Sequence, residues 1–270
     1  MRKKILVIPD IHGRTFWKEP VSRYIESVDR IVFLGDYLDP YEHFIPEDIY
    51  NNLLEIIELK KKHKDKVVLL KGNHDEHYSS ERFRDLAGGS RLDYNNWDKY
   101  HKLFKENKDL FKLIHKEEVN GTTYLFSHAG LTTYWINKVN AFLWWLDNSD
   151  ISVADSNIIE MINMLDDTNE GLELLSVIGH SRSRRGETTG SVLWADIEEH
   201  PIAQGPKIYG LNRVFQVFGH TKLNIGYDKI EYDNFAMIDS RQCFIIDEGI
   251  QEKIISVREY EKKDKSLYDD

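Results

Sequence analysis

The chain has 270 residues, 41% hydrophobic and 30% charged, enough to build a sizeable core without disulfide bonds. Its formal net charge of -10 disfavours broad binding to a nucleic-acid backbone, and charges interrupt every apolar run before the length of a membrane-spanning helix. The single cysteine, Cys243, favours a reducing, cytoplasmic location. We expect one domain over residues 1–270, with a tail from about residue 258 that lacks fixed structure.

Short apolar runs followed by turn residues predict buried strands. They lie at residues 5–8, 31–34, 67–70, 124–126 and 215–218. Residues 46–63 carry apolar side chains at helical spacing, behind an acidic first turn and ahead of a basic last turn, which predicts an amphipathic helix. Further helices are expected from about 97 to 115 and from about 133 to 146. The alternation over residues 235–257 predicts a meander of antiparallel strands, so the whole pattern indicates an α/β fold.

A polar cluster with metal-binding residue types directly follows each predicted strand. These clusters are PDIHG at 9–13, GDYLD at 35–39, GNHDEH at 72–77, SHAG at 127–130 and GHT at 219–221. Because the carboxyl ends of strands in an open α/β sheet converge on one crevice, these side chains are expected to share a site. Their carboxylate, amide and imidazole donors, without a thiolate, suit Mn, Fe or Zn and argue against a closed structural zinc site.

In order and spacing, the five motifs resemble those of the calcineurin-like metallophosphoesterases. Within that superfamily they resemble the branch of protein Ser/Thr phosphatases and their bacterial or phage relatives, because SVLWAD at 191–196 precedes GHT as a similar LWSD element does there. The resemblance implies a metal-dependent phosphoric ester hydrolase with a four-layer α/β/β/α sandwich, in which two mixed sheets are flanked by helices.

The same resemblance implies two divalent metal ions, with Mn favoured and Fe or Zn as alternatives. Carried over position by position, it assigns Asp10 and His12 to the first metal, Asp36 as the bridge, and Asn73, His128 and His220 to the second metal. A hydroxide that bridges the two metals would attack the phosphorus of a phosphomonoester. His74 would be the general acid that protonates the leaving oxygen, and Asp39 would orient its ring.

Two departures from the family pattern bear on substrate binding and on metal ligation. Pro40 stands where the phosphatases carry a phosphate-binding arginine, so another arginine must take that role. The candidates, in order of preference, are Arg213, Arg184, Arg185 and Arg14. The second departure is Lys222 in GHTK, where other branches have a second histidine, which leaves the first metal with fewer protein ligands.

Several alternatives stay open from the sequence. His180 also follows a Gly after an apolar run and competes with His220, which is favoured because SVLWAD precedes it. The substrate is a phosphoprotein or a small phosphoester, and hydrolysis of a phosphodiester or a dinucleoside polyphosphate is the alternative reaction. A catalytically silent scaffold is a third reading, disfavoured because every expected ligand and His74 are present. Oligomeric state is not indicated.

Overall fold

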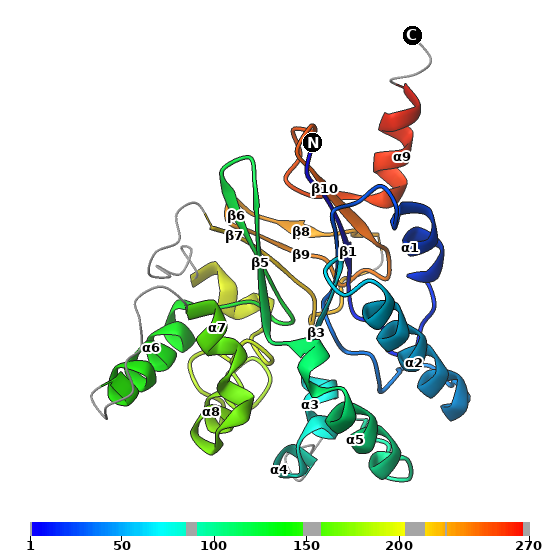
Figure 1. The fold of residues 1–270 in the computed structure, drawn as a ribbon. Helices are drawn as coiled ribbons and strands as arrows, with labels where there is room; N and C mark the ends of the chain where they lie inside the picture. The colour runs from blue at the N-terminus through cyan, green and yellow to red at the C-terminus, as the bar shows by residue number, and fades with distance from the viewer. Residues whose placement is uncertain (1, 85–90, 148–157, 203–213, 225, 267–270) are drawn as a thin grey trace. The chain divides into compact units, whose positions relative to one another are not determined.

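Figure 1 shows the computed structural model, which describes residues 2–84, 91–147, 158–202, 214–224 and 226–266. The chain falls into two units, each with its own mixed β-sheet. The first unit comprises Met1–Lys112, Lys222–Ile230 and Ile238–Asp270, and the second comprises Leu113–Thr221 and Glu231–Met237.

The first unit is organised around a six-stranded sheet in the order β11-β10-β1-β2-β3-β4. Its parallel strands are β1 (Lys4–Ile8), β2 (Arg30–Phe33), β3 (Val67–Leu70) and β4 (Phe111–Lys112). Strands β10 (Phe244–Asp247) and β11 (Ile255–Ser256) are antiparallel to their neighbours. Ile8 pairs with Phe33, and Phe33 pairs with Leu69, so β1, β2 and β3 end at the same edge of the sheet.

The first unit also contains helical segments among its described residues. They are α1 (Lys18–Tyr24), α2 (Pro46–Lys62), α3 (Asn73–Ser79), α4 (Glu81–Arg84), α5 (Trp97–Glu106), the 3-10 turn η1 (Lys108–Leu110) and α9 (Val257–Ser266). Helix α2 confirms its prediction, because Pro46 starts it, acidic side chains fill its first turn and lysines fill its last. Its Leu53 and Ile56 are buried in a core shared with Phe33 and Leu69.

The second unit has a five-stranded sheet in the order β5-β6-β7-β9-β8. Its strands are β5 (Ile114–Val119), β6 (Thr122–Ser127), β7 (Val214–Phe218), β9 (Phe235–Met237) and the short β8 (Ile230–Glu231). Its helical segments are α6 (Thr133–Asp147), α7 (Ile158–Asn163), η2 (Leu165–Asp167), α8 (Asn169–Leu175) and η3 (Ile197–Ile202). Strand β6 is antiparallel to β5 but parallel to β7. Two mixed sheets with flanking helices confirm the predicted α/β class.

The helix predicted from about 97 to 115 is too long. Helix α5 ends at Glu106, where the Asn107 side chain donates to the carbonyl of Leu103 at 2.8 Å. Phe111 then pairs with Leu69 in the first sheet, and β5 begins at Ile114 in the second. The apolar residues after residue 107 therefore lie in edge strands of the two sheets. The spacing of apolar residues alone does not distinguish such short strands from a helix.

The meander predicted over residues 235–257 is also wrong. Strand β9 runs parallel to β7 in the second sheet, whereas β10 pairs with β1 in the first. Within residues 235–257, an antiparallel pairing joins β10 to β11. The tail from residue 258, for which we expect no fixed structure, lies in α9 up to Ser266, where the Tyr260 hydroxyl donates to Asp247 at 2.7 Å.

Among the described residues, none of the helices offers an apolar stretch of the length that a bilayer crossing needs.

Candidate metal centre

Three strand ends of the first unit deliver its polar site residues. Asp10 and His12 follow β1, Asp36 and Asp39 follow β2, and Asn73 and His74 open α3 directly after β3. All six side chains are buried. Parallel pairing in register brings these strand ends together, which is why residues more than 60 positions apart occupy one edge.

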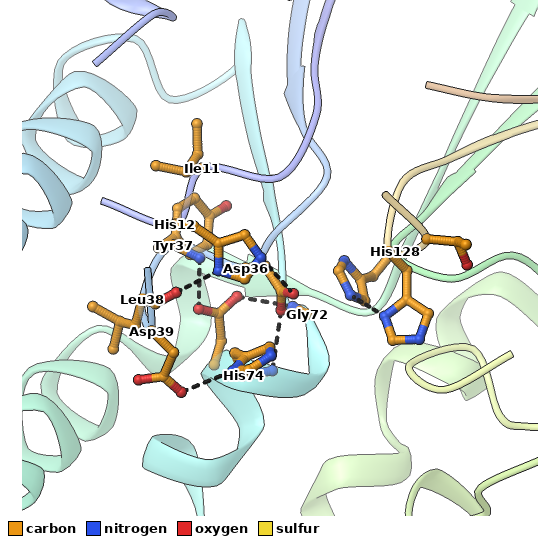
Figure 2. A network of polar contacts seen from close by, with 12 residues as sticks. Ile11, His12, Asp36, Tyr37, Leu38, Asp39, Gly72, His74 and His128 are labelled. Atoms are coloured by element: carbon orange, nitrogen blue, oxygen red, sulfur yellow. Dashed lines mark hydrogen bonds and ion pairs between the residues drawn. The ribbon is translucent and has the colours of Figure 1, made fainter. Parts of the chain in front are cut away.

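Asp10, His12 and Asp36 form a cluster whose candidate ligand atoms all lie within 4.8 Å of one another. His12 Nδ1 contacts the carbonyl oxygen of Leu38 at 2.7 Å, so Nδ1 carries the proton and donates it (Figure 2). The other nitrogen, Nε2, lies 3.4 Å from a carboxylate oxygen of Asp36. The ring therefore presents its lone pair to the cluster, as a metal ligand must.

Burial lowers the pKa of His12 to about 4, although the Asp36 carboxylate opposes this shift. A neutral imidazole and two buried carboxylates are the chemistry that a divalent cation accepts. Without a cation, two carboxylates so close together would repel each other away from solvent, at a cost that an isolated hydrogen bond does not offset. The donor set therefore fits a divalent metal ion.

The loops that carry these side chains adopt strained backbone conformations. His12, Asp36 and Asp39 have φ angles of 45°, 49° and 55°, in the left-handed region that residues other than glycine seldom adopt. Such conformations persist only where the surrounding structure enforces them, and they cluster at functional sites. Here the amides of Ile11 and His12 both donate to the carbonyl of Asp36, which holds the first two loops together.

Two glycines leave room for this arrangement. Gly35 has a φ of 106°, and a Cβ there would come within 2.5 Å of the Gly72 amide nitrogen. A Cβ on Gly72 would lie 2.0 Å from the carboxylate of Asp36. Only glycine at both positions lets Asp36 approach the start of α3, where the amide of His74 donates to it at 3.0 Å.

His74 lies beside the cluster and has a dedicated carboxylate partner. Its Nδ1 contacts Asp39 at 2.8 Å (Figure 2). The Tyr78 hydroxyl donates to the other oxygen of Asp39 at 2.5 Å. The rings of His74 and His12 are 5.2 Å apart. With Nδ1 fixed by Asp39, Nε2 is the nitrogen that His74 can offer to a substrate.

The charge state of His74 suits proton donation. Burial alone would lower its pKa, but the carboxylates of Asp36 and Asp39 outweigh this effect and raise it to about 9. Asp75 supports the same loops, because its two carboxylate oxygens accept from the amides of Tyr37 and Gly72 at 2.9 and 2.8 Å. Burial raises the pKa of Asp75 well above its usual value.

The second unit contributes a pair of histidines. His128 follows β6 and His220 follows β7, and these strands are adjacent and parallel, with Phe126 paired to Val217. His128 Nε2 lies 3.0 Å from His220 Nδ1. Two nitrogens bound to one cation at about 2.1 Å with a right angle between them would be about 3 Å apart, so this spacing fits shared metal ligation as well as a hydrogen bond.

His180 does not occupy the equivalent place. Its Nδ1 contacts the carbonyl of Thr188 at 2.7 Å, and its side chain is exposed. The LWAD segment instead lies against the two histidines, since the amide of Ala129 donates to the carbonyl of Val192 and the Trp194 ring stands 6.2 Å from that of His220.

The four arginines proposed for phosphate binding differ in placement. Arg184 and Arg185 are exposed in a turn, and Arg213 lies outside the described residues. Arg14, two positions after His12, is largely buried and donates to Glu42 at 2.8 Å. Arg91, which the sequence did not single out, donates to the carbonyls of Pro40 and Tyr41 at 3.3 and 3.2 Å, beside the position of the missing arginine.

Several other polar residues escaped the sequence interpretation. Arg182 contacts Asp196 at 2.6 Å and Thr221 at 3.0 Å, and so links the LWAD and GHT motifs. Asp239 is buried near Asp36; burial raises its pKa to about 6, and the charge of Asp36 adds to the shift. An aspartate directly after the apolar run FAMI repeats the pattern that identified Asp10, a signal that could have found it. No local signal distinguishes Arg182.

Comparison with known proteins gives one family and several structural likenesses. The sequence matches the calcineurin-like phosphoesterase family over residues 3–223. A protein serine/threonine phosphatase from Saccharomyces cerevisiae, with similarity to human phosphatase PP5, is 15% identical; the match covers 94% of this chain and 78% of that one, with a TM-score of 0.52. A cold-active protein-tyrosine phosphatase from a Shewanella species is 15% identical over 90% and 75% of the two chains, with a TM-score of 0.49. No curated protein matches the sequence significantly.

Proposed function

The chain belongs to the calcineurin-like phosphoesterase family, and from that premise we propose that it is a metal-dependent phosphatase that hydrolyses a phosphomonoester. The observation that carries the proposal is the buried cluster of Asp10, His12 and Asp36 with the His74–Asp39 pair beside it. The cluster offers ligands for a metal ion. His74, oriented by Asp39, offers the proton donor that ester hydrolysis requires.

Divalent cations, which this family binds, would be held by the polar residues of the five sequence motifs. We propose Asp10 and His12 as ligands of the first cation, Asp36 as the shared carboxylate, and Asn73, His128 and His220 as ligands of the second. Manganese is the proposed metal. When bound, the cations supply a water acidified toward neutral pH and positive charge opposite the phosphoryl oxygens.

The chain's own residues then manage one proton and one leaving group. As the ester bond to phosphorus breaks, the departing oxygen gains a negative charge, which His74 neutralises by giving up the proton on Nε2. Asp39 keeps the Nδ1 proton in place and stabilises the charged ring before the transfer. Tyr78, by donating to Asp39, holds that carboxylate in position.

The first experiment measures turnover of four substrates by metal-stripped protein refilled with Mn. The substrates are p-nitrophenyl phosphate, its bis ester, a phosphothreonine peptide and diadenosine tetraphosphate. Mn-dependent cleavage of the two monoesters is expected. Preference for the bis ester or the dinucleotide would favour the alternative hydrolase, metal binding with no turnover would favour a silent scaffold, and failure to bind metal would refute the proposal.

The His74→Asn variant tests the proton donor within the same panel. A threonine alkoxide is a far poorer leaving group than p-nitrophenolate, so the loss should be larger for the peptide, about 100-fold or more, than for the aryl ester. His63→Asn, at the C-terminal end of α2, is the matched control and should keep full activity. Equal losses on both substrates would argue against general acid catalysis by His74.

A further inference from the structure

The carboxylate of Glu42, in the first unit, contacts two arginines from distant parts of the chain. Arg14 Nη2 donates to one oxygen of Glu42 at 2.8 Å, and Arg241 Nη2 contacts the other oxygen at 2.6 Å. Each oxygen thus has its own guanidinium. Each guanidinium uses one nitrogen for this contact, and a guanidinium is also the group that best matches the paired oxygens of a phosphoryl group.

Arg14 lies close to the ligand cluster. It follows His12 by two positions, its Nη1 donates to the carbonyl of Ile11 at 3.4 Å, and its side chain is only 12% exposed. Its Nε is buried and meets no hydrogen-bond acceptor among the described residues. A buried guanidinium with unused donor capacity beside the cluster of Asp10, His12 and Asp36 is suited to an anionic ligand.

Arg241 reaches the same carboxylate through a strained backbone. Its φ angle is 60°, a left-handed conformation that is unfavourable for a residue other than glycine or asparagine. Asp239, two positions earlier, is buried within electrostatic range of Asp36, Arg14 and Arg241. The turn between β9 and β10 therefore brings a second guanidinium toward the edge where Asp36 lies.

Glu42 is held in a way that permits its release. Residues 40–45 form irregular backbone between β2 and α2, and the Glu42 side chain is 39% exposed. An exposed ion pair contributes little to stability, so a doubly charged ligand that is also attracted to bound cations can displace the Glu42 carboxylate. A monoester phosphate carries two charges and three free oxygens, whereas a diester carries one charge and two.

We propose that Arg14 and Arg241 together form the phosphate-binding subsite, and that Glu42 occupies this subsite until a phosphomonoester displaces it. The inference deepens the proposed function and rests on it for the location of the phosphate. It assigns the role of the arginine missing at Pro40 to a pair, of which Arg241 had no sequence signal. Competition from Glu42 also selects dianionic monoesters over monoanionic diesters, because the weaker anion displaces the carboxylate less readily.

The test is calorimetric titration of the Mn-loaded full chain with inorganic phosphate, which needs no turnover. Arg241→Gln should weaken phosphate binding about tenfold, the value of a charge-assisted hydrogen bond. Glu42→Gln should strengthen binding up to about fivefold, because the competing charge is gone. Arg241→Lys should fall between the wild type and Arg241→Gln, since it keeps the charge but not the fork.

Three matched variants control for charge and stability. Arg23→Gln and Glu47→Gln remove exposed charges that pair elsewhere in the same unit, with Glu261 and Lys99, and should leave phosphate affinity unchanged. Arg91→Gln tests the other arginine beside Pro40 and should have little effect. Far-ultraviolet circular dichroism of every variant establishes that it is folded.

The sign of the Glu42 effect decides between a displaceable and a structural role. If Glu42→Gln weakened phosphate binding, Glu42 would be a brace that positions the arginines and the proposed displacement would be wrong. An unchanged affinity in Arg241→Gln, or a large loss in Arg91→Gln alone, would place the subsite elsewhere. Because binding is measured directly, these outcomes stand whether or not the wild type hydrolyses any of the tested monoesters.

Discussion

Both units place candidate metal ligands directly after adjacent parallel strands, but the ligand atoms differ. In the first, parallel strands β1 and β2 end in loops that gather the carboxylates of Asp10 and Asp36 with His12. In the second, parallel strands β6 and β7 end in His128 and His220, whose nitrogens are 3.0 Å apart. His12, Asp36 and His220 all adopt left-handed backbone conformations, so in both units strained backbone after a strand carries a candidate metal ligand.

The difference between the donor sets has an energetic consequence. Two imidazoles can form a hydrogen bond with each other, so the absence of a cation costs the second unit little free energy. Two buried carboxylates repel each other, and a hydrogen bond such as the one from the His74 amide to Asp36 leaves that repulsion in place. The first unit should therefore depend on a cation for stability much more than the second.

The largest effect is expected from Asp36→Asn. Loss of the proposed shared carboxylate should reduce Mn-dependent turnover at least about 1000-fold, because both cations would lose a ligand. The metal-free variant should unfold at the same or a higher urea concentration than metal-free wild type, since a buried repulsion is removed.

Asp109→Asn, an exposed position before β4, is the control for Asp36→Asn and should match the wild type in turnover. A metal-free Asp36→Asn protein clearly less stable than metal-free wild type would show that the acidic cluster does not carry the predicted repulsion.

The contribution of the second unit is tested by His220→Asn against His180→Asn. His220→Asn should lower turnover about 100-fold and reduce the Mn bound per chain, measured by atomic absorption after gel filtration. His180→Asn should change neither quantity, because that ring is exposed and contacts the carbonyl of Thr188. Equal losses in the two variants would overturn the assignment of His220 as the ligand.

A smaller effect is expected from Tyr78→Phe. Asp39 would lose one hydrogen-bond donor but keep its contact with His74, so kcat should fall about tenfold while KM changes little. The hydroxyl also accepts from the amide of Asp93 at 2.7 Å, so urea unfolding should accompany the kinetics. A change in KM with constant kcat would contradict a role for Tyr78 through Asp39.

The smallest effect on turnover is expected from Asp247→Asn, at the far end of the first sheet. Burial would raise the pKa of Asp247, but donation from Gly249, Tyr260 and Arg2 outweighs it and lowers the pKa below its usual value. The carboxylate therefore stabilises the fold above about pH 4, and this contribution disappears as the pH falls through the lowered pKa.

For Asp247→Asn we expect unchanged turnover and a loss of about 1–3 kcal/mol in the free energy of unfolding at pH 7. Urea titrations should give the same loss at pH 5 and a smaller one below about pH 4. A loss that stayed constant down to pH 3 would show that the ionised carboxylate is not the source of the stability.

Much of the fold was predictable because its signals are local. Each of the five expected strands exists, and helix α2 lies where its periodicity, acidic start and basic end predict it. The false helix after residue 107 and the false meander after residue 235 share one cause. Short apolar segments fit several structures equally well, and only their distant partners, such as Leu69 for Phe111, select one.

The candidate site divides in the same way. The sequence by itself determined which residues are candidate metal ligands, because they lie directly after apolar runs that predict strands, and the resemblance to the family added His74 as the expected proton donor. Tertiary structure alone decided that His12 gives Nδ1 to Leu38, that Tyr78 reaches Asp39, and that Arg14 and Arg241 meet at Glu42. These contacts join residues from 26 to about 200 positions apart through single polar atoms. The periodic pattern of apolar residues in the sequence does not predict such contacts.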